Sequence, residues 1–429
     1  MSSMSRFQLL FTGFLIFLGV GGAILFATAK GRGSDGAVPV VMWGSVESQG
    51  IPNFASFLSN LGEEVRITYV EKDPALIEDE LISALARGSG PDMILLPQDL
   101  ILKQLDKFYV VPFESYSART FKDSFVREGE LFMVPGGIVG LPFIIDPMVM
   151  YWNRDILTNA GQALPPATWI DFVALAPKVT KKDSNNNILQ SLAAFGEMRN
   201  VTHAKDIVSL LAMQAGTQIV ERDETGLLYS TFDMRGANLA PAEQAVSFYT
   251  EFSNPVKPSY SWNRSMPKDK DAFTAGKLAV YFGYASEVAG IRAANPNLDF
   301  DVALVPQAGD KRLTFGNMYA VTLLKASPKV AAAWQGALTL TSLETQKAWV
   351  EQSGLPPVRR DMLGTLPSDE YKSIFYQSAL ISSAWLDPYR ESTDGVFMRL
   401  IESVTSGKLR VSESVQTASV EIDNLLRGN

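Results

Sequence analysis

The chain has 429 residues, of which 46% are hydrophobic and 20% are charged, a composition that suits a folded protein with room for two domains. Its net charge of -8 disfavours a basic surface for nucleic-acid phosphates, so we expect no nucleic-acid partner. Cysteine is absent, which excludes disulfides, thiolate metal sites and a lipidated N-terminal cysteine. The one histidine, His203, lies in no recognisable catalytic or metal-binding motif. We therefore expect no cofactor, no metal and no enzyme of the common hydrolase types.

The first 29 residues predict export of the rest of the chain. Residues 7–29 carry no charge, and residues 9–26 are strongly apolar, a length that approaches a bilayer span. Residues 27–29 form an A-x-A pattern, which instead suits cleavage by signal peptidase. Residues 1–29 are thus a membrane anchor or a signal segment, and the glycine-rich residues 30–37 are a linker. Either way we expect the protein outside the cytoplasm, anchored to the outer face of the membrane or periplasmic.

Strand and helix patterns then alternate. Residues 38–43 form a short apolar run, and apolar residues at spacings of three and four follow over residues 54–61. Alternation over residues 65–69 predicts a second strand, residues 77–85 a second helix, and residues 93–96 a third strand. This order is typical of βαβ units with a parallel sheet.

Parallel sheets bind ligands beyond the carboxyl ends of their strands. The loops after Trp43 and Leu96 are therefore the first places to seek a site. The turn at residues 88–92 connects a helix to the third strand, and it is not a phosphate-binding loop because no GK[ST] follows. Residues 183–187 begin like a calcium loop, but Ile188 stands where the loop needs glycine, so we expect a polar turn.

Helix starts and further strands mark the second half. Thr168 can cap a helix with Asp171 three residues later, and Thr341 with Glu344 repeats this pattern. An apolar stripe over residues 411–426 predicts the last helix. Further strand-like runs lie at residues 278–282, 300–304 and 320–324. Segments of α/β type therefore lie on both sides of a helix-rich block.

Several aromatic residues lie beside predicted strand ends or in loops: Trp43, Trp262, Tyr284, Tyr319 and Trp385. Aromatic faces pack against the apolar faces of sugar rings, and by analogy with aromatic pairs each contact gives about 0.5–1.5 kcal/mol beyond burial. Each of these residues could equally belong to a core.

A series of short motifs occurs in a fixed order between residues 38 and 429. They are W-G-S at 43–45, G-x-x-P-D at 88–92, G-L-P-F at 140–143, Y-W-N-R-D at 151–155, P-P-A-T-W at 165–169, F-T-A-G-K-L-A-V at 273–280, F-G-N at 315–317 and G-L-P-P at 354–357. In these motifs the chain resembles the family-1 extracellular solute-binding proteins of ABC importers, the group that includes maltose-binding proteins.

This resemblance implies an α/β, two-lobed periplasmic-binding-protein fold of type II with a ligand cleft between the lobes. It places residues 38–147 and 277–330 in lobe 1, and residues 148–276 and 331–429 in lobe 2. The implied protein is a monomer without catalytic activity, which captures a small solute by hinge closure and delivers it to the permease subunits of an ABC importer. The implied solute is a sugar or oligosaccharide.

Position in these motifs and near strand ends selects the candidate ligand-binding residues. They are Trp43, Glu47, Asp146, Trp262, Tyr284, Gly316, Asn317 and Trp385. Asp92 and Trp169 also match family motifs, but we expect structural roles for both.

Three alternatives remain open at this point. The same fold could serve as a surface sensor without a transporter, or it could bind a polyamine or peptide. A secreted glycan-cleaving enzyme is the third, and it would need two carboxylates about 5–9.5 Å apart. No sequence motif pairs two carboxylates in this way.

Overall fold

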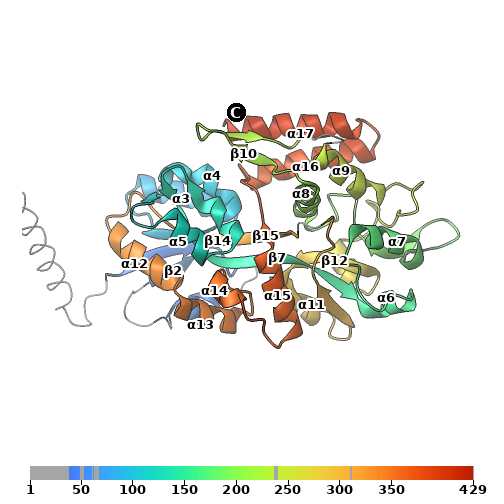
Figure 1. Cartoon of the computed structure of the whole chain (residues 1–429), viewed down its shortest axis with the longest axis horizontal. Coiled ribbons are helices and arrows are strands. Elements are labelled where there is room, and N and C mark those ends of the chain that lie inside the picture. The colour runs from blue at the N-terminus through green and yellow to red at the C-terminus, as the bar shows by residue number, and fades with distance from the viewer. Residues whose placement is uncertain are drawn as a thin grey trace, which may run out of the picture.

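The computed structural model describes residues 38–48, 53–59, 61, 67–235, 240–309 and 312–428. The predicted anchor or signal at 1–29 and the linker at 30–37 lie outside these residues. Figure 1 shows two α/β lobes side by side, joined by strands that include β7. In the described ranges, no helix combines the length and apolar character needed to cross a bilayer.

The first lobe is built on the predicted parallel strands. Strand β1 (Val40–Gly44) pairs in parallel with β2 (Ile67–Glu71) on one side and with β3 (Met93–Pro97) on the other. Helices α2 (Phe54–Ser59) and α3 (Ile77–Ala86) connect these strands, as the apolar spacing predicts. The sheet continues through β14 (Thr314–Leu323), which lies antiparallel to β3. The βαβ prediction for this region is therefore confirmed.

Strand β7 (Gly140–Asn153) belongs to both lobes, and each of its 14 residues is buried. Residues 140–147 pair with β14 of the first lobe. Residues 148–153 pair instead with β12 (Leu278–Tyr284) and β13 (Phe300–Ala303). Strand β12 in turn pairs in parallel with β9 (Ile188–Ala193). Through β7, the strands of the two lobes, here called the first and second sheets, form one continuous ten-stranded sheet. The change of partners after Pro147 makes this part of β7 a connection between the lobes.

The chain crosses between the sheets twice more. It leaves β13 in the second sheet and enters β14 in the first, and it later forms β15 (Ser382–Ser383), which pairs with the start of β14. Resemblance placed residues 277–330 in lobe 1, whereas β12 and β13 pair with the second half of β7. We therefore propose that the lobes divide after Pro147, between β13 and β14, and near β15.

Helices surround both sheets (Figure 1). The first lobe carries α4 (Ile101–Gln104), α5 (Ala118–Ser124), α12 (Val330–Leu340), α13 (Leu343–Ser353) and α14 (Arg360–Leu363). The second carries α6 (Arg154–Asn159), α7 (Trp169–Val179), α8 (Ala204–Ala215), α9 (Pro241–Glu251), α10 (Asp269–Thr274), α11 (Val288–Ala294), α16 (Arg390–Thr405) and α17 (Val411–Leu426). Helix α15 (Glu370–Leu380) packs on β7 and β13.

Short strands complete the fold. Strands β4 (Val111–Pro112), β5 (Met133–Val134) and β6 (Gly137–Ile138) form a small sheet, β10 (Val220–Arg222) pairs with β11 (Leu228–Ser230), and β8 (Lys181–Lys182) pairs with β9. The turn between β8 and β9 is the predicted polar turn, in which Asp183 Oδ1 accepts the backbone N–H groups of Asn185 and Asn187. Within the ranges that the structure covers, no cluster of three potential metal ligands occurs.

Each lobe has an aromatic core. In the first, Phe54, Phe57 and Phe143 pack around Trp349, with ring centroids 5.1–5.6 Å from the indole. In the second, Phe195 and Phe282 lie 5.2 Å apart beside Phe172. Both groups of rings belong to one continuous hydrophobic core that extends from one lobe into the other.

The first turns of α7 and α13 show whether the two predicted helix caps are correct. Thr168 accepts the backbone N–H of Asp171 at 3.2 Å and donates to its carboxylate at 2.7 Å, as predicted. The second predicted cap is wrong by one residue, because Ser342 accepts the Thr345 N–H and begins α13. Thr341 instead ends α12, with its hydroxyl donating to the carbonyl of Ala337.

Candidate functional site

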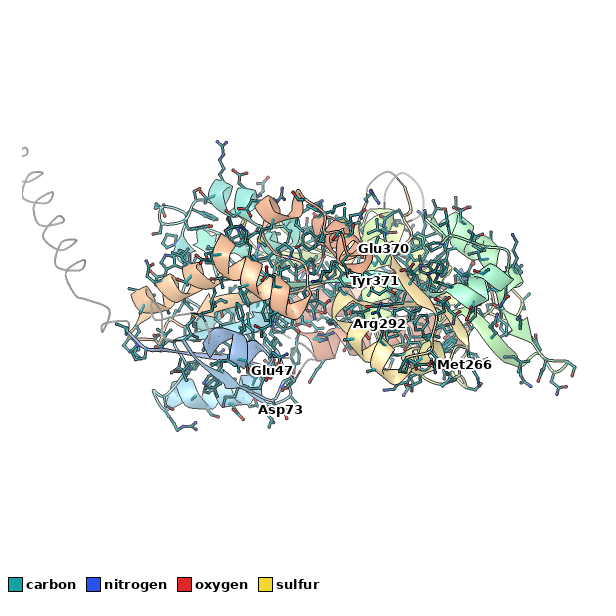
Figure 2. All side chains as sticks on the ribbon, turned by 90° about the horizontal axis from the view of Figure 1, so that it is seen from below. Glu47, Asp73, Met266, Arg292, Glu370 and Tyr371 are labelled. Atoms are coloured by element: carbon teal, nitrogen blue, oxygen red, sulfur yellow. The ribbon has the colours of Figure 1, made fainter. Side chains whose placement is uncertain are left out.

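A cavity of about 790 Å³ lies between the lobes. Lobe 1 contributes strand residues 146, 317 and 319 and the end of α13, whereas lobe 2 contributes residues 284–290 and 292, with 202, 203 and 270. Helix α15 adds residues 371, 372 and 375, preceded by residue 369. Figure 2 shows Tyr371 and Arg292 near each other on the lobe 2 side, with Glu47 in the other lobe. Both lobes therefore shape one cavity, as a cleft that closes on a ligand requires.

The floor of this cavity carries a buried carboxyl group. Asp146 is 4% exposed, and its Oδ1 accepts the backbone N–H of Ser286 at 3.0 Å. Burial raises its pKa to about 7, with the charge of Glu287 acting in the same direction and the Ser286 hydrogen bonds acting against it. Asp146 can therefore accept or donate a hydrogen bond to a ligand hydroxyl near neutral pH.

A second carboxylate, Glu287, organises the lobe 2 wall. It accepts hydrogen bonds from Lys270 at 2.6 Å and from the Tyr281 hydroxyl at 2.8 Å, and it lies 2.7 Å from Nε2 of His203. Burial opposes its ionisation, but His203 and Lys270 outweigh burial and lower its pKa to about 2. Burial likewise opposes the charge on His203, whose pKa is nevertheless raised by Glu287. These contacts fix an ionised, fully paired group at the wall.

Tyr284 stands where β12 ends. Its hydroxyl donates to Asp206 at 2.8 Å, and its carbonyl accepts the hydroxyl of Tyr151 at 2.6 Å. Its ring lies 4.8 Å from the imidazole of His203 in an edge-on arrangement. Both ends of the tyrosine are thus held in place beside the cavity.

A smaller cavity of about 20 Å³ adjoins the main one, with Tyr284, Asn317 and Arg390 lining both. Arg390 reaches from the start of α16 to Asp99 of the first lobe, at 3.0 Å. The charge of Asp99 is the main cause of the raised pKa of Arg390. This ion pair joins the two lobes across the cleft.

The outer wall combines aromatic and basic groups. The guanidinium of Arg292 lies 4.8 Å from the ring centre of Tyr371, a cation–π contact between α11 and α15. The Tyr371 hydroxyl donates to the Phe300 carbonyl at 3.0 Å, which fixes the ring on β13. Arg292 is therefore supported by a ring that cannot easily move.

Four of the eight sequence candidates come together here. Asp146, Tyr284 and Asn317 line the main cavity, and Trp385 lines the smaller one. The Trp385 indole N–H donates to Ser209 at 3.2 Å, so its polar edge already has a partner. Contact between these residues and a ligand stays a prediction.

The other four candidates lie elsewhere. Trp43 borders a surface hollow on lobe 1 under Lys72, whose ammonium is 4.0 Å from the ring centre. Glu47 accepts the Ala55 N–H in the first turn of α2. Trp262 is 0% exposed, so in this conformation it serves the core. Gly316 lines neither of the two cavities, and its carbonyl accepts the Gln98 amide at 2.8 Å.

The two residues expected to be structural do make internal contacts. Asp92 accepts the Val41 N–H at 2.8 Å and the Ser327 hydroxyl at 2.6 Å, which ties β1 to the chain after β14. Trp169 donates to Gln214 at 2.6 Å.

Several cavity residues were not among the sequence candidates: His203, Lys270, Glu287, Arg292, Tyr371 and Arg390. No local motif marks them, because they come from separate segments that meet only in the folded protein. His203 lies in no recognisable motif, yet in this wall its Nε2 lies 2.7 Å from the Glu287 carboxylate and helps to hold it.

The chain belongs to a family of bacterial extracellular solute-binding proteins, whose model matches residues 54–374. It is 23% identical over 322 residues to a binding protein of Brucella abortus strain 2308, covering 70% of this chain and 72% of that protein. A binding protein of Brucella suis biovar 1 matches over the same length at the same identity. As a member of this family, the protein acts outside the cytoplasm as a solute-binding protein.

Solved structures share the two-lobed fold. An ABC transporter solute-binding protein of Thermotoga lettingae, bound to alpha-D-tagatose, is 20% identical with a TM-score of 0.67 over 91% of this chain and 100% of its own. The cyclic alpha-maltosyl-1,6-maltose binding protein of Arthrobacter globiformis is 14% identical, with a TM-score of 0.75 over 92% and 100%. The predicted fold class is therefore confirmed.

Proposed function

We propose that this protein captures a sugar or oligosaccharide in the cavity between its lobes and delivers it to the permease subunits of an ABC importer. The observation that carries the proposal is one cavity of about 790 Å³ to which both lobes contribute aromatic rings and polar groups. Tyr284, Tyr371 and Phe375 are aromatic residues of its lining, and Asp146 and Asn317 are polar residues of the same lining. This combination suits a ligand with apolar ring faces and many hydroxyls.

The related proteins support the same ligand class. The similar structures described above include a tagatose-bound transporter protein and a maltosaccharide-binding protein. The family of extracellular solute-binding proteins supports a role in capture outside the cell. We propose that the protein works as a monomer, without turnover of its ligand.

Closure is the proposed mechanism. A ligand that contacts both lobes only in the closed form shifts the open–closed equilibrium by its differential binding energy. Residues of β7 and β14 line the cavity on one side and residues of β12 and α11 line it on the other, which supports this mechanism. The closed form is then the form presented to the transporter.

Attachment to the membrane is a separate proposal. Residues 1–29 contain an apolar stretch and no lipid-bearing cysteine, so we propose that this stretch, if it is not cleaved, tethers the receptor itself. Mass spectrometry of the protein from membrane and soluble fractions distinguishes an intact N-terminus from one cleaved after Ala29.

The ligand class is tested by calorimetry and thermal shift on residues 31–429. We expect saturable binding of a monosaccharide or oligosaccharide and a rise in melting temperature, since a ligand that binds only the folded state stabilises it. Saturable binding of spermidine or short peptides, with no response to saccharides, would overturn the proposal. Hydrolysis of a glycan by the purified protein would show that it is an enzyme.

A further inference from the structure

We propose that the saccharide bound in this cavity is acidic, carrying a carboxylate, sulfate or phosphate that Arg292 and Lys372 recognise. This inference rests on the proposed function, because it specifies the ligand of the same cavity. It is carried by the placement and pairing of the basic side chains around that cavity.

Four lysine or arginine residues line the cavity: Lys270, Arg292, Lys372 and Arg390. Two of them are already neutralised, since Lys270 pairs with Glu287 at 2.6 Å and Arg390 pairs with Asp99 at 3.0 Å. Among the residues that the structure describes, Arg292 and Lys372 have no carboxylate within 4.0 Å. Two cationic groups thus face the cavity without an acidic partner.

The surroundings of Arg292 and Lys372 favour binding of an anionic ligand. The protein as a whole carries a net charge of -8, so two unpaired cations beside one cavity run against the general charge of the molecule. Arg292 is held over Tyr371, which limits the rotamer freedom that it would lose on binding a ligand. A guanidinium fixed in this way can make paired hydrogen bonds to a carboxylate or sulfate.

The acidic groups that line the cavity do not form ion pairs with Arg292 or Lys372. Glu287 is paired with Lys270 and His203. Asp146 lies on the floor with its carboxyl group bonded to the Ser286 N–H. Asp369 caps α15 and accepts the Lys372 backbone N–H at 2.8 Å, so its carboxylate is directed at its own helix.

The arrangement also argues against a polyamine. A polycation entering the cavity would face the charges of Arg292 and Lys372, which repel it. An acidic saccharide instead places its ring near the aromatic residues and its charged group near these two cations.

The experiment compares matched neutral and acidic ligands by calorimetry. We expect glucuronate to bind more tightly than glucose, and digalacturonate more tightly than galactobiose, by about tenfold or more, which corresponds to about 1.4 kcal/mol. The preference should fall as salt is raised, because an exposed charge interaction is screened. Glucose 6-sulfate and glucose 6-phosphate tell which anionic group is preferred.

Substitutions of single basic residues show which of them cause the preference for acidic saccharides. Arg292→Gln and Lys372→Gln should each lower the affinity for the acidic member of each pair much more than the affinity for the neutral member, so that most of the acidic preference is lost. Arg427→Gln and Lys178→Gln, which change exposed basic residues of lobe 2 away from the cavity, are the matched controls. Arg292→Lys is a further variant that retains charge, and circular dichroism checks the folding of all five.

The outcomes separate the two proposals. Binding of neutral saccharides at equal or higher affinity than acidic ones overturns this inference and leaves the proposed function standing. An acidic preference that survives both cavity variants also overturns it. Absence of binding by every saccharide overturns both proposals together.

Discussion

Two carboxyl groups near the connection between the lobes are buried where charge is costly. Asp146 lies on the cavity floor, and Glu128 lies under β15, where one of its oxygens accepts the Ser382 hydroxyl. Burial is the main cause of the raised pKa of both groups, to about 7 for Asp146 and about 8 for Glu128. Compared with the unfolded chain, the folded protein therefore favours the protonated form of both groups.

The stability of the protein should consequently depend on pH. A carboxyl group with a raised pKa in the folded state stabilises the fold below its unfolded pKa, and this contribution is lost as pH rises through the folded value. We expect the melting temperature to fall between pH 5 and pH 8, and to fall less in Asp146→Asn and in Glu128→Gln. Differential scanning calorimetry measures this, with exposed Glu224→Gln as control. An unchanged pH profile in both variants would contradict the assignment.

Gly316 illustrates a residue whose small size is required by its neighbours. A Cβ atom at this position would overlap Oε2 of Glu128 and the hydroxyl of Ser382. We expect Gly316→Ala to reduce the free energy of unfolding by about 1–3 kcal/mol, the usual cost of overpacking. Chemical denaturation provides the measurement. Gly309→Ala, where a Cβ meets no atom within 4 Å, should be close to neutral.

At the scale of elements, local signals in the sequence predicted the parts of the fold that depend on nearby residues. The strands β1 and β3 and the cap at Thr168 follow from apolar runs and from a residue pair three positions apart. The start of α13 was misplaced by one residue because Thr341 and Ser342 are both good caps, and only the structure shows which one ends α12.

The cavity could be predicted only in part, for a physical reason. Asn317 lies in a family motif, whereas Asp146 and Tyr284 were selected by their positions near the first crossover and at a predicted strand end, and all three line the cavity. Arg292 and Tyr371 meet through the packing of α11 beside α15, and nothing within either segment marks that contact. Trp262 has polar neighbours in sequence, yet its side chain is fully buried, since polarity along the chain does not report three-dimensional burial.

The Thr168 cap gives a prediction at this scale. Thr168→Ala removes the hydroxyl that accepts the Asp171 N–H, so α7 loses one of its first-turn partners. We expect a loss of about 1 kcal/mol in the free energy of unfolding. Thr158→Ala is the control, because this exposed threonine lies inside α6 and caps no helix. Equal effects of the two substitutions in urea denaturation would show that the cap contributes nothing.

At the scale of the whole molecule, contacts across the cleft set the balance between open and closed forms. Arg390 and Asp99 form an ion pair between lobes at 3.0 Å, and the ammonium of Lys103 lies 3.5 Å from the ring centre of Tyr389. Both contacts link the region around α4 with the chain that leads into α16. They are the interactions that opening of the cleft would break.

Arg390→Gln should therefore populate the open form more in the absence of ligand. The ion pair is partly exposed, so we expect a shift of about 1 kcal/mol or less. The chain has no cysteine, so cysteines introduced at the exposed positions Ile82 and Val256 allow one dye to be attached to each lobe. Energy transfer between the two dyes measures the distance between the lobes. Arg399→Gln, whose ion pair with Glu421 lies within lobe 2, should leave the distance unchanged. A distance unchanged in both variants would mean that Arg390 does not hold the lobes together.

The order of the strands also governs when the protein can fold during its synthesis. Strand β14 lies between β3 and β7 in the first sheet, although its residues come more than 150 positions after β7 in the sequence. An emerging chain that has produced only β1 to β7 cannot complete this sheet, and contacts so distant in sequence form slowly. A nascent chain should therefore remain unfolded until most of it has left the ribosome. Because proteins of this family act outside the cytoplasm, such late closure of the sheet is compatible with export of an unfolded chain.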